Sequence, residues 1–150
     1  MRQRFPSRWG SPSRPHHLPR LLVEDDDPAL ALSDFSRFHQ AGFEVAWCSG
    51  PAGRADACSL LRNGDCPLLR GADVVLHGLN PDTRIASAIR ASHPETGLVQ
   101  VVRARAEIGG SGQDPGQPTG SDFVLSGSDG VETQVRALCR ALSRRCPPSP

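Results

Sequence analysis

The sequence contains no lysine: all 17 of its basic residues are arginine, set against 16 acidic residues, for a net charge of +1. The missing lysine excludes any site that depends on a lysine ammonium group. The near-neutral balance excludes a polybasic nucleic-acid coat protein. Phosphate-cradling glycine motifs, nucleotide fingerprints and a Ser-His-Asp order are also missing, so the common nucleotide-binding and hydrolase classes have no support in the sequence.

Long apolar runs and an even set of cysteines are missing as well. No stretch approaches the roughly 18 consecutive apolar residues of a membrane span, and no apolar run follows the N-terminal arginines. The five cysteines stand at irregular spacings, which fit neither a secreted disulfide framework nor a zinc site. We therefore expect a cytoplasmic protein with no membrane partner. A chain of 150 residues is long enough to bury a core without disulfides or metals.

Composition divides the chain into three parts. The first 20 residues hold five arginines, four prolines and no acid, which indicates that residues 1–19 form a disordered arm. One interpretation is that the arm is a solvated tail, or even the product of a misplaced start codon. The other is that it contacts nucleic acid or an acidic partner. We expect residues 20–145 to form one domain, interrupted by a Gly/Pro-rich loop at Gly109–Ser121, and residues 146–150 to form a disordered tail.

Within the domain, short apolar runs alternate with helical patterns. The expected strands are Leu21–Val23, Phe43–Trp47, Val74–Leu76, Leu98–Val102 and Phe123–Leu125. Strands that alternate with helices imply right-handed crossovers and a parallel sheet covered on both faces. The sequence thus predicts an α/β fold, a doubly wound five-stranded parallel sheet. In such sheets ligands bind at the carboxyl ends of the strands.

Specific residues mark where the helices begin and end. The expected helices follow Asp27-Pro28, start at Pro51, follow Asn80-Pro81 and follow Asp129, which forms a capping-box pattern with Glu132. An Asp or Asn before proline gives an N-cap and a proline at the first helical position. Gly42 and Gly64 are placed to end the first two helices. In the first helix, we expect Leu32, Phe35 and Phe38 to share the buried face.

Acidic residues cluster directly after the first strand, at positions 24 to 27. Two adjacent carboxylates at a strand end can supply oxygen ligands to Mg²⁺, and Asp25 and Asp26 are the candidate pair. The alternative is structural: Asp27 caps the helix, and its neighbours stabilise the positive end of the helix dipole. The spacing alone leaves both possibilities open.

This segment resembles the start of a known domain. The sequence Leu21-Leu22-Val23-Glu24-Asp25-Asp26-Asp27-Pro28-Ala29-Leu30 is similar to the opening of the receiver domain of bacterial response regulators. Similar segments follow at Gly42-Phe43-Glu44-Val45, at Ala72-Asp73-Val74-Val75-Leu76 and at Val102-Arg103-Ala104-Arg105-Ala106-Glu107. The resemblance covers residues 20 to 144 and implies a flavodoxin- or CheY-like (βα)5 fold with a role in phosphorelay signalling.

The sequence departs from the receiver pattern at its key positions. The aspartate that accepts the phosphoryl group would fall on His77, counting back from Pro81, or on Gly78, counting forward from Asp73. The family's Ser or Thr after the fourth strand is Arg103, and its lysine after the fifth strand is Ser126. The resemblance therefore implies a degenerate pocket made by Glu24, Asp25, Asp26, Arg103 and Ser126. The Gly109–Ser121 loop replaces the family's fourth helix.

Two residues offer alternatives at this pocket. Asp82 is a conceivable substitute acceptor, but its place in the first turn of a helix favours a dipole partner. Arg103, beside the acidic cluster, would neutralise it as a fixed cation in place of Mg²⁺ and lysine; the other interpretation is an exposed arginine.

The sequence predicts a non-enzymatic receiver-like domain that works without phosphorylation, through a protein partner or by sensing a ligand. We expect no resident cofactor, with Mg²⁺ the one metal to consider. One alternative is a small metal-dependent enzyme that uses the acidic cluster. Another is a DNA-associated protein that contacts nucleic acid through the arm, whose salt dependence would reveal it.

Overall fold

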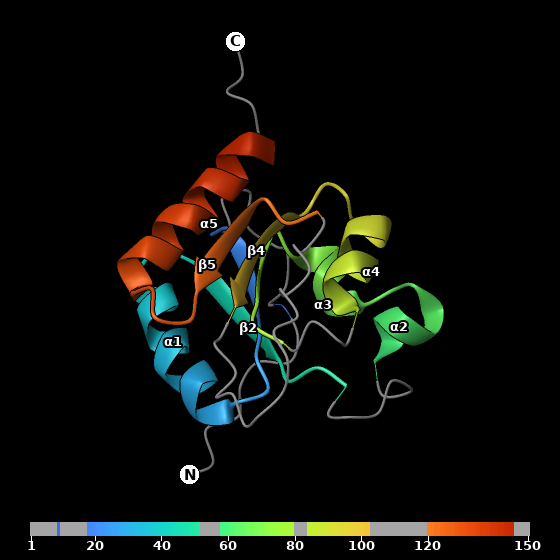
Figure 1. Ribbon diagram of the computed structural model, residues 1–150, viewed down its shortest axis with the longest axis horizontal. Helices are drawn as coiled ribbons and strands as arrows, with labels where there is room; N and C mark the ends of the chain where they lie inside the picture. The colour runs from blue at the N-terminus through green and yellow to red at the C-terminus, as the bar shows by residue number, and fades with distance from the viewer. Residues whose placement is uncertain (1–8, 10–17, 52–57, 80–83, 103–119, 146–150) are drawn as a thin grey trace, which may run out of the picture.

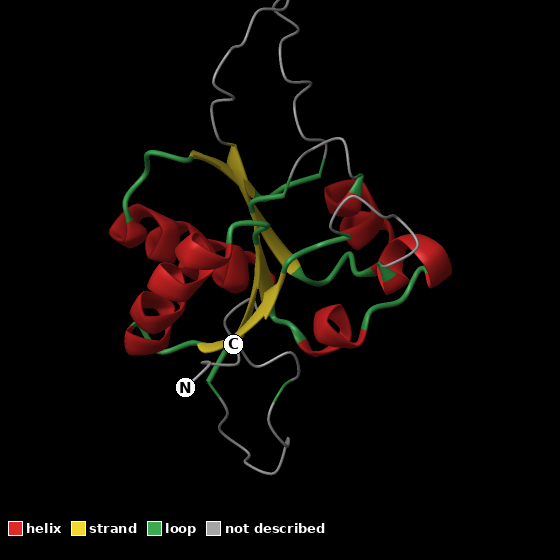
Figure 2. Cartoon of the chain, turned by 90° about the horizontal axis from the view of Figure 1, so that it is seen from below, coloured by secondary structure: helices red, strands yellow, loops and turns green. Residues whose placement is uncertain are grey.

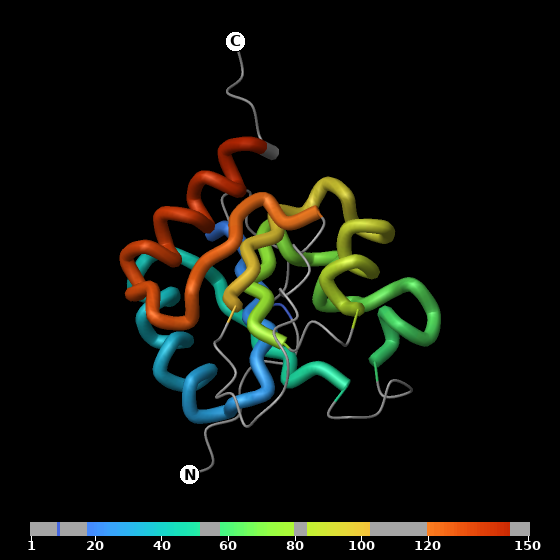
Figure 3. The backbone as a smooth tube through the Cα atoms, in the orientation of Figure 1, coloured from blue at the N-terminus to red at the C-terminus, as the bar shows by residue number. Residues whose placement is uncertain are grey.

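A computed structural model describes residues 9, 18–51, 58–79, 84–102 and 120–145 of the chain. The strands are β1 (Arg20–Glu24), β2 (Glu44–Cys48), β3 (Val74–His77), β4 (Gly97–Val102) and β5 (Phe123–Ser126). The helices are α1 (Pro28–Gln40), α2 (Ser59–Asn63), α3 (Pro67–Gly71), α4 (Ile85–Ser92) and α5 (Val131–Arg145). Figure 3 follows this order along the chain.

The five strands form one parallel sheet in the order β2-β1-β3-β4-β5. This confirms the predicted doubly wound fold. The chain order reverses between β1 and β3, so the crevice at their carboxyl ends is the topological switch point, where such folds bind ligands.

Helices cover both faces of the sheet. Helices α1 and α5 lie on one face, and α2, α3 and α4 lie on the other (Figures 1 and 2). Successive strand residues point to opposite faces: Leu21 and Val23 pack in the core under α1 and α5, whereas Leu22 packs under the three short helices. The strands between the two layers are therefore apolar on both sides, as expected for a buried parallel sheet.

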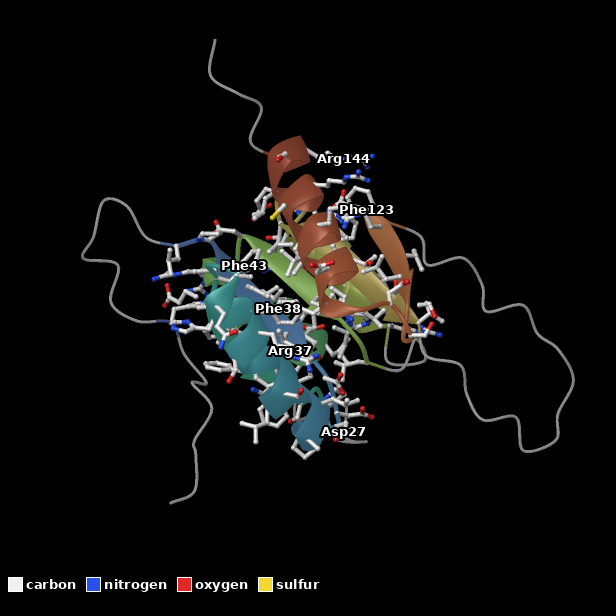
Figure 4. The ribbon with its side chains drawn as sticks, turned by 90° about the vertical axis from the view of Figure 1, so that its left-hand side faces the viewer. Asp27, Arg37, Phe38, Phe43, Phe123 and Arg144 are labelled. Carbon is white, nitrogen blue, oxygen red and sulfur yellow. The ribbon has the colours of Figure 1, made fainter. Side chains whose placement is uncertain are left out.

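Helix α1 begins and ends as predicted, but the prediction for one residue of its buried face is wrong. The Asp27 carboxylate accepts the Ala29 N–H at 2.9 Å, and Gly42 takes a positive φ of 98° after the last turn. Phe38 is buried against the sheet (Figure 4), but Leu32 is 43% exposed. Phe35 also packs against the core, and Ala31, one residue before Leu32, takes the buried position in the first turns of the helix.

The region between β2 and β3 holds two short helices. We expected one helix from Pro51 to Gly64; its described part is α2, and Gly64 ends it in the left-handed conformation, as predicted. Residues 52–57 lie outside the described part. Helix α3 was not predicted. It begins at Pro67, after a Cys66 N-cap, and buries Leu69.

Helix α4 buries Ile85 and Ile89, which were both predicted for its inner face. Its expected start at Asn80-Pro81 and the possible acceptor Asp82 lie outside the described residues. The loop predicted at Gly109–Ser121 also lies outside them, apart from its last two residues.

The start of α5 differs from the predicted capping box. The Asp129 carboxylate accepts the Ser126 N–H at 2.7 Å, so it closes the turn between β5 and α5 instead of capping Glu132. Near the other end of α5, the Arg144 guanidinium lies 4.6 Å from the centre of the Phe123 ring on β5 (Figure 4). No helix in the described ranges is long and apolar enough to cross a membrane.

Two residues of the predicted arm contact the domain: the Pro19 carbonyl accepts the Glu44 N–H at 3.0 Å, and Trp9 packs beside α3. The Trp9 indole N–H donates to the Leu68 carbonyl at 2.8 Å, and the Arg20 guanidinium lies 5.5 Å from the centre of the Trp9 ring. A side chain at Gly71 would collide with this indole. The expectation of a disordered arm is therefore wrong for Trp9, while residues 1–8 and 10–17 lie outside the described part.

Arg90 joins α4 to the amino ends of β4 and β5. Its guanidinium donates to the carbonyls of Gly120 at 2.6 Å and Thr96 at 3.1 Å. It also lies 3.4 Å from a carboxylate oxygen of Asp122, and that oxygen accepts the Leu98 N–H at 2.8 Å. One side chain thus connects three segments that are distant in the sequence.

We expect Arg90→Gln to lower the free energy of unfolding by about 2 kcal/mol, because several charge-assisted hydrogen bonds are lost together. Urea denaturation monitored by circular dichroism measures this change. Arg140→Gln, at an exposed position on α5, is the matched control and should change stability by less than about 0.5 kcal/mol. Equal effects of the two substitutions would contradict the role given to Arg90.

Candidate functional site

The carboxyl ends of β1 and β3 bring Glu24 and His77 together. The two residues are register partners in the parallel ladder. They follow the alternation of Leu22 and Val75, which pack under α2, α3 and α4, so both side chains point to that face. The Gly78 N–H then donates to the Glu24 carbonyl at 2.8 Å, which continues the ladder by one residue.

Glu24 and His77 form a buried hydrogen-bonded pair. Glu24 Oε2 lies 2.6 Å from His77 Nδ1, and the two side chains are 5% and 0% exposed. Because an ionised carboxylate can only accept, the ring donates from Nδ1. The other ring nitrogen, Nε2, is buried without a partner. His77 is thus the fully buried last residue of β3, not a residue of the following loop.

The acidic cluster does not act as a unit. Glu24 is bound to His77. Asp25 is buried, and its carboxylate accepts the Asp27 N–H at 2.8 Å. Its backbone is held on both sides, because its N–H donates to the Cys48 carbonyl and its carbonyl accepts the Trp47 indole N–H. Asp26 is exposed. The four acids therefore have four different environments.

Mg²⁺, which the resemblance implies, has incomplete support from these residues. Magnesium needs several oxygens in near-octahedral geometry. Across the described ranges no three His, Cys, Asp or Glu side chains are grouped as metal ligands, and Gly78 adds no side-chain oxygen. A magnesium site at Asp25 and Asp26 stays a prediction that rests on two carboxylates.

The remaining predicted pocket residues are at the ends of β4 and β5. Ser126 pairs in register with Val102, and its hydroxyl lies 2.9 Å from that of Ser128. Arg103 lies outside the described residues, so its neutralising role stays a prediction. Gly78, the other position considered for the acceptor, lines a cavity together with Asp25.

This cavity lies between α1, α5 and the carboxyl ends of β1 and β3, where the sequence predicted a pocket, but the residues that α1 and α5 contribute were not predicted. It has a volume of about 200 Å³. Asp34 and Arg37 line it from α1, and Asp129 and Gln134 line it from the start of α5. Figure 4 shows Arg37 on the side of α1 toward α5. The spacing of Leu30, Asp34 and Arg37 places them on one helix face, a signal that was available in the sequence.

Cys48, at the end of β2, borders the Glu24 side of the site. Burial raises the pKa of its thiol from 9.0 to about 11; the hydrogen bond that the Gly50 N–H donates to the sulfur acts in the opposite direction, and the nearby Glu24 charge adds to the rise. The thiol is therefore fully protonated at neutral pH and is a poor nucleophile.

We expect His77→Leu to lower the free energy of unfolding by about 3–5 kcal/mol, because it leaves the Glu24 carboxylate buried without a donor. The double variant Glu24→Leu/His77→Leu should recover most of this loss, since no charge then remains to be buried. Urea denaturation of both single variants and the double variant gives the coupling energy.

The matched control is the His93–Glu95 pair, with 3.6 Å between His93 Nδ1 and a Glu95 carboxylate oxygen and a Glu95 side chain that is 72% exposed. Glu95→Leu should change stability by less than about 1 kcal/mol. Additive effects of the Glu24 and His77 substitutions would show that the buried pair is not coupled.

The raised pKa of Cys48 predicts a loss of stability in alkali. Below pH 9 the thiol is protonated in both states, whereas between pH 9 and about 11 only the unfolded chain forms the thiolate, so stability falls as pH rises. The loss should reach about 2–3 kcal/mol. The chain has no tyrosine and no lysine, so only cysteines titrate among its side chains in this range.

Denaturation curves from pH 8.5 to 11 measure this effect. Cys48→Ala should remove most of the pH dependence, while Cys139→Ala, at an exposed thiol, should leave it in place. A wild-type stability that does not change up to pH 11 would refute the assignment.

Comparison with known proteins gives matches at the level of structure alone. No family model matches the sequence, and no curated protein is significantly similar to it. Similar solved structures include a response regulator receiver domain protein from Clostridium thermocellum, 16% identical with a TM-score of 0.61 over 85% of this chain and 97% of that one.

Two further solved structures match over nearly the same extent. A response regulator receiver protein from Sinorhizobium medicae WSM419 is 22% identical with a TM-score of 0.57, covering 85% of this chain and 97% of that one. A sensor protein from Polaromonas sp. JS666 is 20% identical with a TM-score of 0.60, covering 85% and 98%. The chain thus has the fold of a response regulator receiver domain, CheY-like in its strand order.

Proposed function

We propose that the protein is a receiver-like signalling domain that works without aspartyl phosphorylation. The observation that carries this proposal is the pair of residues at the end of β3. Gly78 has no side chain to accept a phosphoryl group, and His77 is completely buried on Glu24. Both residues considered for the acceptor position are thereby excluded from the aspartyl chemistry of the family.

The chemistry needs several groups at once. Phosphoryl transfer to a carboxylate requires an acceptor oxygen held in line, a bridging metal, and a cation that offsets the charge developing on the equatorial oxygens. The chain supplies no lysine for the last role, and Ser126 is neutral. With the acceptor missing as well, two of the three requirements are unmet by the residues in those positions.

A domain of this kind acts by binding. We take the contact surface to be the face formed by β4, β5 and α5, which the receiver resemblance implies. On that face Val124 is 50% exposed on the edge strand β5, and an exposed apolar residue beside an unpaired strand edge is suited to a protein contact. The proposed partner is a protein of a phosphorelay-type signalling pathway. We propose that the receiver-like chain itself is not an enzyme.

We expect no phosphoryl group to be added when the protein is incubated with acetyl phosphate and Mg²⁺, because neither His77 nor Gly78 supplies a carboxylate at the end of β3. Intact mass spectrometry measures the product. An added phosphoryl group on the wild-type protein would overturn the proposal.

The matched variant for this experiment is Gly78→Asp/Ser126→Lys. Gly78 is not one of the described glycines with a positive φ, so its backbone accommodates aspartate. The double variant restores an acceptor and a cation at the two positions where the family has them. It should gain a phosphoryl group under the same conditions, which shows that the assay detects a competent site in this fold.

A further inference from the structure

The cavity between α1 and α5 combines a buried acceptor that has no partner, an excess of carboxylates and apolar walls. We propose that it binds a small organic cation with an apolar stem, of the alkylammonium or alkylguanidinium class. The cavity includes Gly78, one of the two positions considered for the acceptor, so the inference rests on the proposed function, in which this position carries no phosphoryl group.

The buried acceptor is the side-chain oxygen of Gln134. Gln134 is 8% exposed and lines the cavity. Its amide nitrogen donates to the Asp129 carbonyl at 3.3 Å, which fixes the orientation of the amide, because the reverse orientation would place two oxygens together. The side-chain oxygen is then buried with no donor among the described residues. A buried acceptor without a donor is unfavourable, so this position favours a ligand that donates.

The charges around the cavity select a cation. Asp25, Asp34 and Asp129 line it, as does Glu24, whose carboxylate is engaged by His77. Among the described residues that line the cavity, and leaving Glu24 aside, three carboxylates face one guanidinium, that of Arg37. A field of this sign attracts cations and repels carboxylates and phosphates. An anionic ligand would also bring no donor to the Gln134 oxygen.

The walls select an organic cation over a metal ion. Leu30, Leu76 and Val131 line the cavity beside the polar groups. A hydrated metal ion gains nothing from apolar walls, whereas an alkyl stem is stabilised by leaving water against them. The Asp25 and Asp129 carboxylates each already accept a backbone N–H. Such carboxylates are better suited to accept one further hydrogen bond from a ligand than to coordinate a metal ion directly. The volume of about 200 Å³ admits only a small ligand.

The test is a titration of the full chain, labelled with ¹⁵N, with butylguanidinium and butylammonium chloride, followed by NMR. Sodium butyrate, which has the same kind of stem and the opposite charge, is the ligand control, and MgCl₂ is the metal control. Ionic strength is held constant. We expect saturable shifts of the Asp34 and Gln134 amides with both organic cations in the millimolar range typical of such small probes, and none with butyrate.

Gln134→Leu separates binding from folding. It removes the acceptor without a partner and also the N–H that donates to the Asp129 carbonyl, two changes with opposite effects on stability. The variant should therefore melt within about a few degrees of the wild type, yet bind butylguanidinium about tenfold more weakly. Gln40→Leu, the same change at an exposed position at the end of α1, should leave the affinity within twofold. Asp34→Asn should also weaken binding, because it removes one negative charge.

Four results would overturn the proposal: no saturation by either organic cation at tens of millimolar, equal shifts with butyrate, an unchanged affinity of Gln134→Leu, or displacement of the organic cation by MgCl₂. The first would mean that only water satisfies Gln134, and the last that the cavity is a metal site. None of these results depends on the acetyl phosphate experiment, so failure of the ligand proposal and failure of the proposed function are distinguishable.

Discussion

A carboxylate buried under an apolar layer requires a hydrogen-bond donor. In this protein the requirement of Glu24 determines which side chains fill the topological switch point between β1 and β3. The donor to the Glu24 carboxylate comes from the neighbouring strand β3, on which His77 is the register partner of Glu24. The two side chains point under α2, α3 and α4, where the surrounding core is apolar. A charge there is tolerated only while its partner remains. The first acid after the β1 core is thereby used to hold two strands together and is withdrawn from the open edge of the sheet.

The features that the sequence predicted well depend on near neighbours. Asp27 caps α1 through the Ala29 N–H, only two residues away, and Gly64 ends α2 because a left-handed residue is needed at that one position. The parallel sheet followed from the alternation of strands and helices, which restricts the possible topologies severely. Local chemistry was therefore sufficient for the fold class and for the order of the elements apart from α3.

The features that were missed depend on contacts between distant residues. The bond between Glu24 and His77 joins residues 53 positions apart, and nothing near either residue indicates the other. Leu32 was assigned to the buried face because an apolar stripe can be drawn through it, but the sheet selects the stripe of Ala31 and Phe38. Helix α3 has five residues, too few to show a helical period. Gln134 and Asp34 become neighbours of one cavity only once α1 and α5 lie on the same face.

The two faces of the sheet therefore have different capacities at the switch point. On the face under α2, α3 and α4, the switch point is occupied by the hydrogen-bonded pair of Glu24 and His77, whose side chains are 5% and 0% exposed. The face under α1 and α5 keeps an open, polar space. Helix α5 lines the cavity with Gln134 and contributes to the outer surface with Arg136 and Arg140, which are exposed. If a ligand binds the cavity more tightly in one position of α5 than in another, it shifts the equilibrium between the two positions by that difference in binding free energy. Because Gln134 and these two arginines belong to the same helix, α5 connects the cavity with the outer surface.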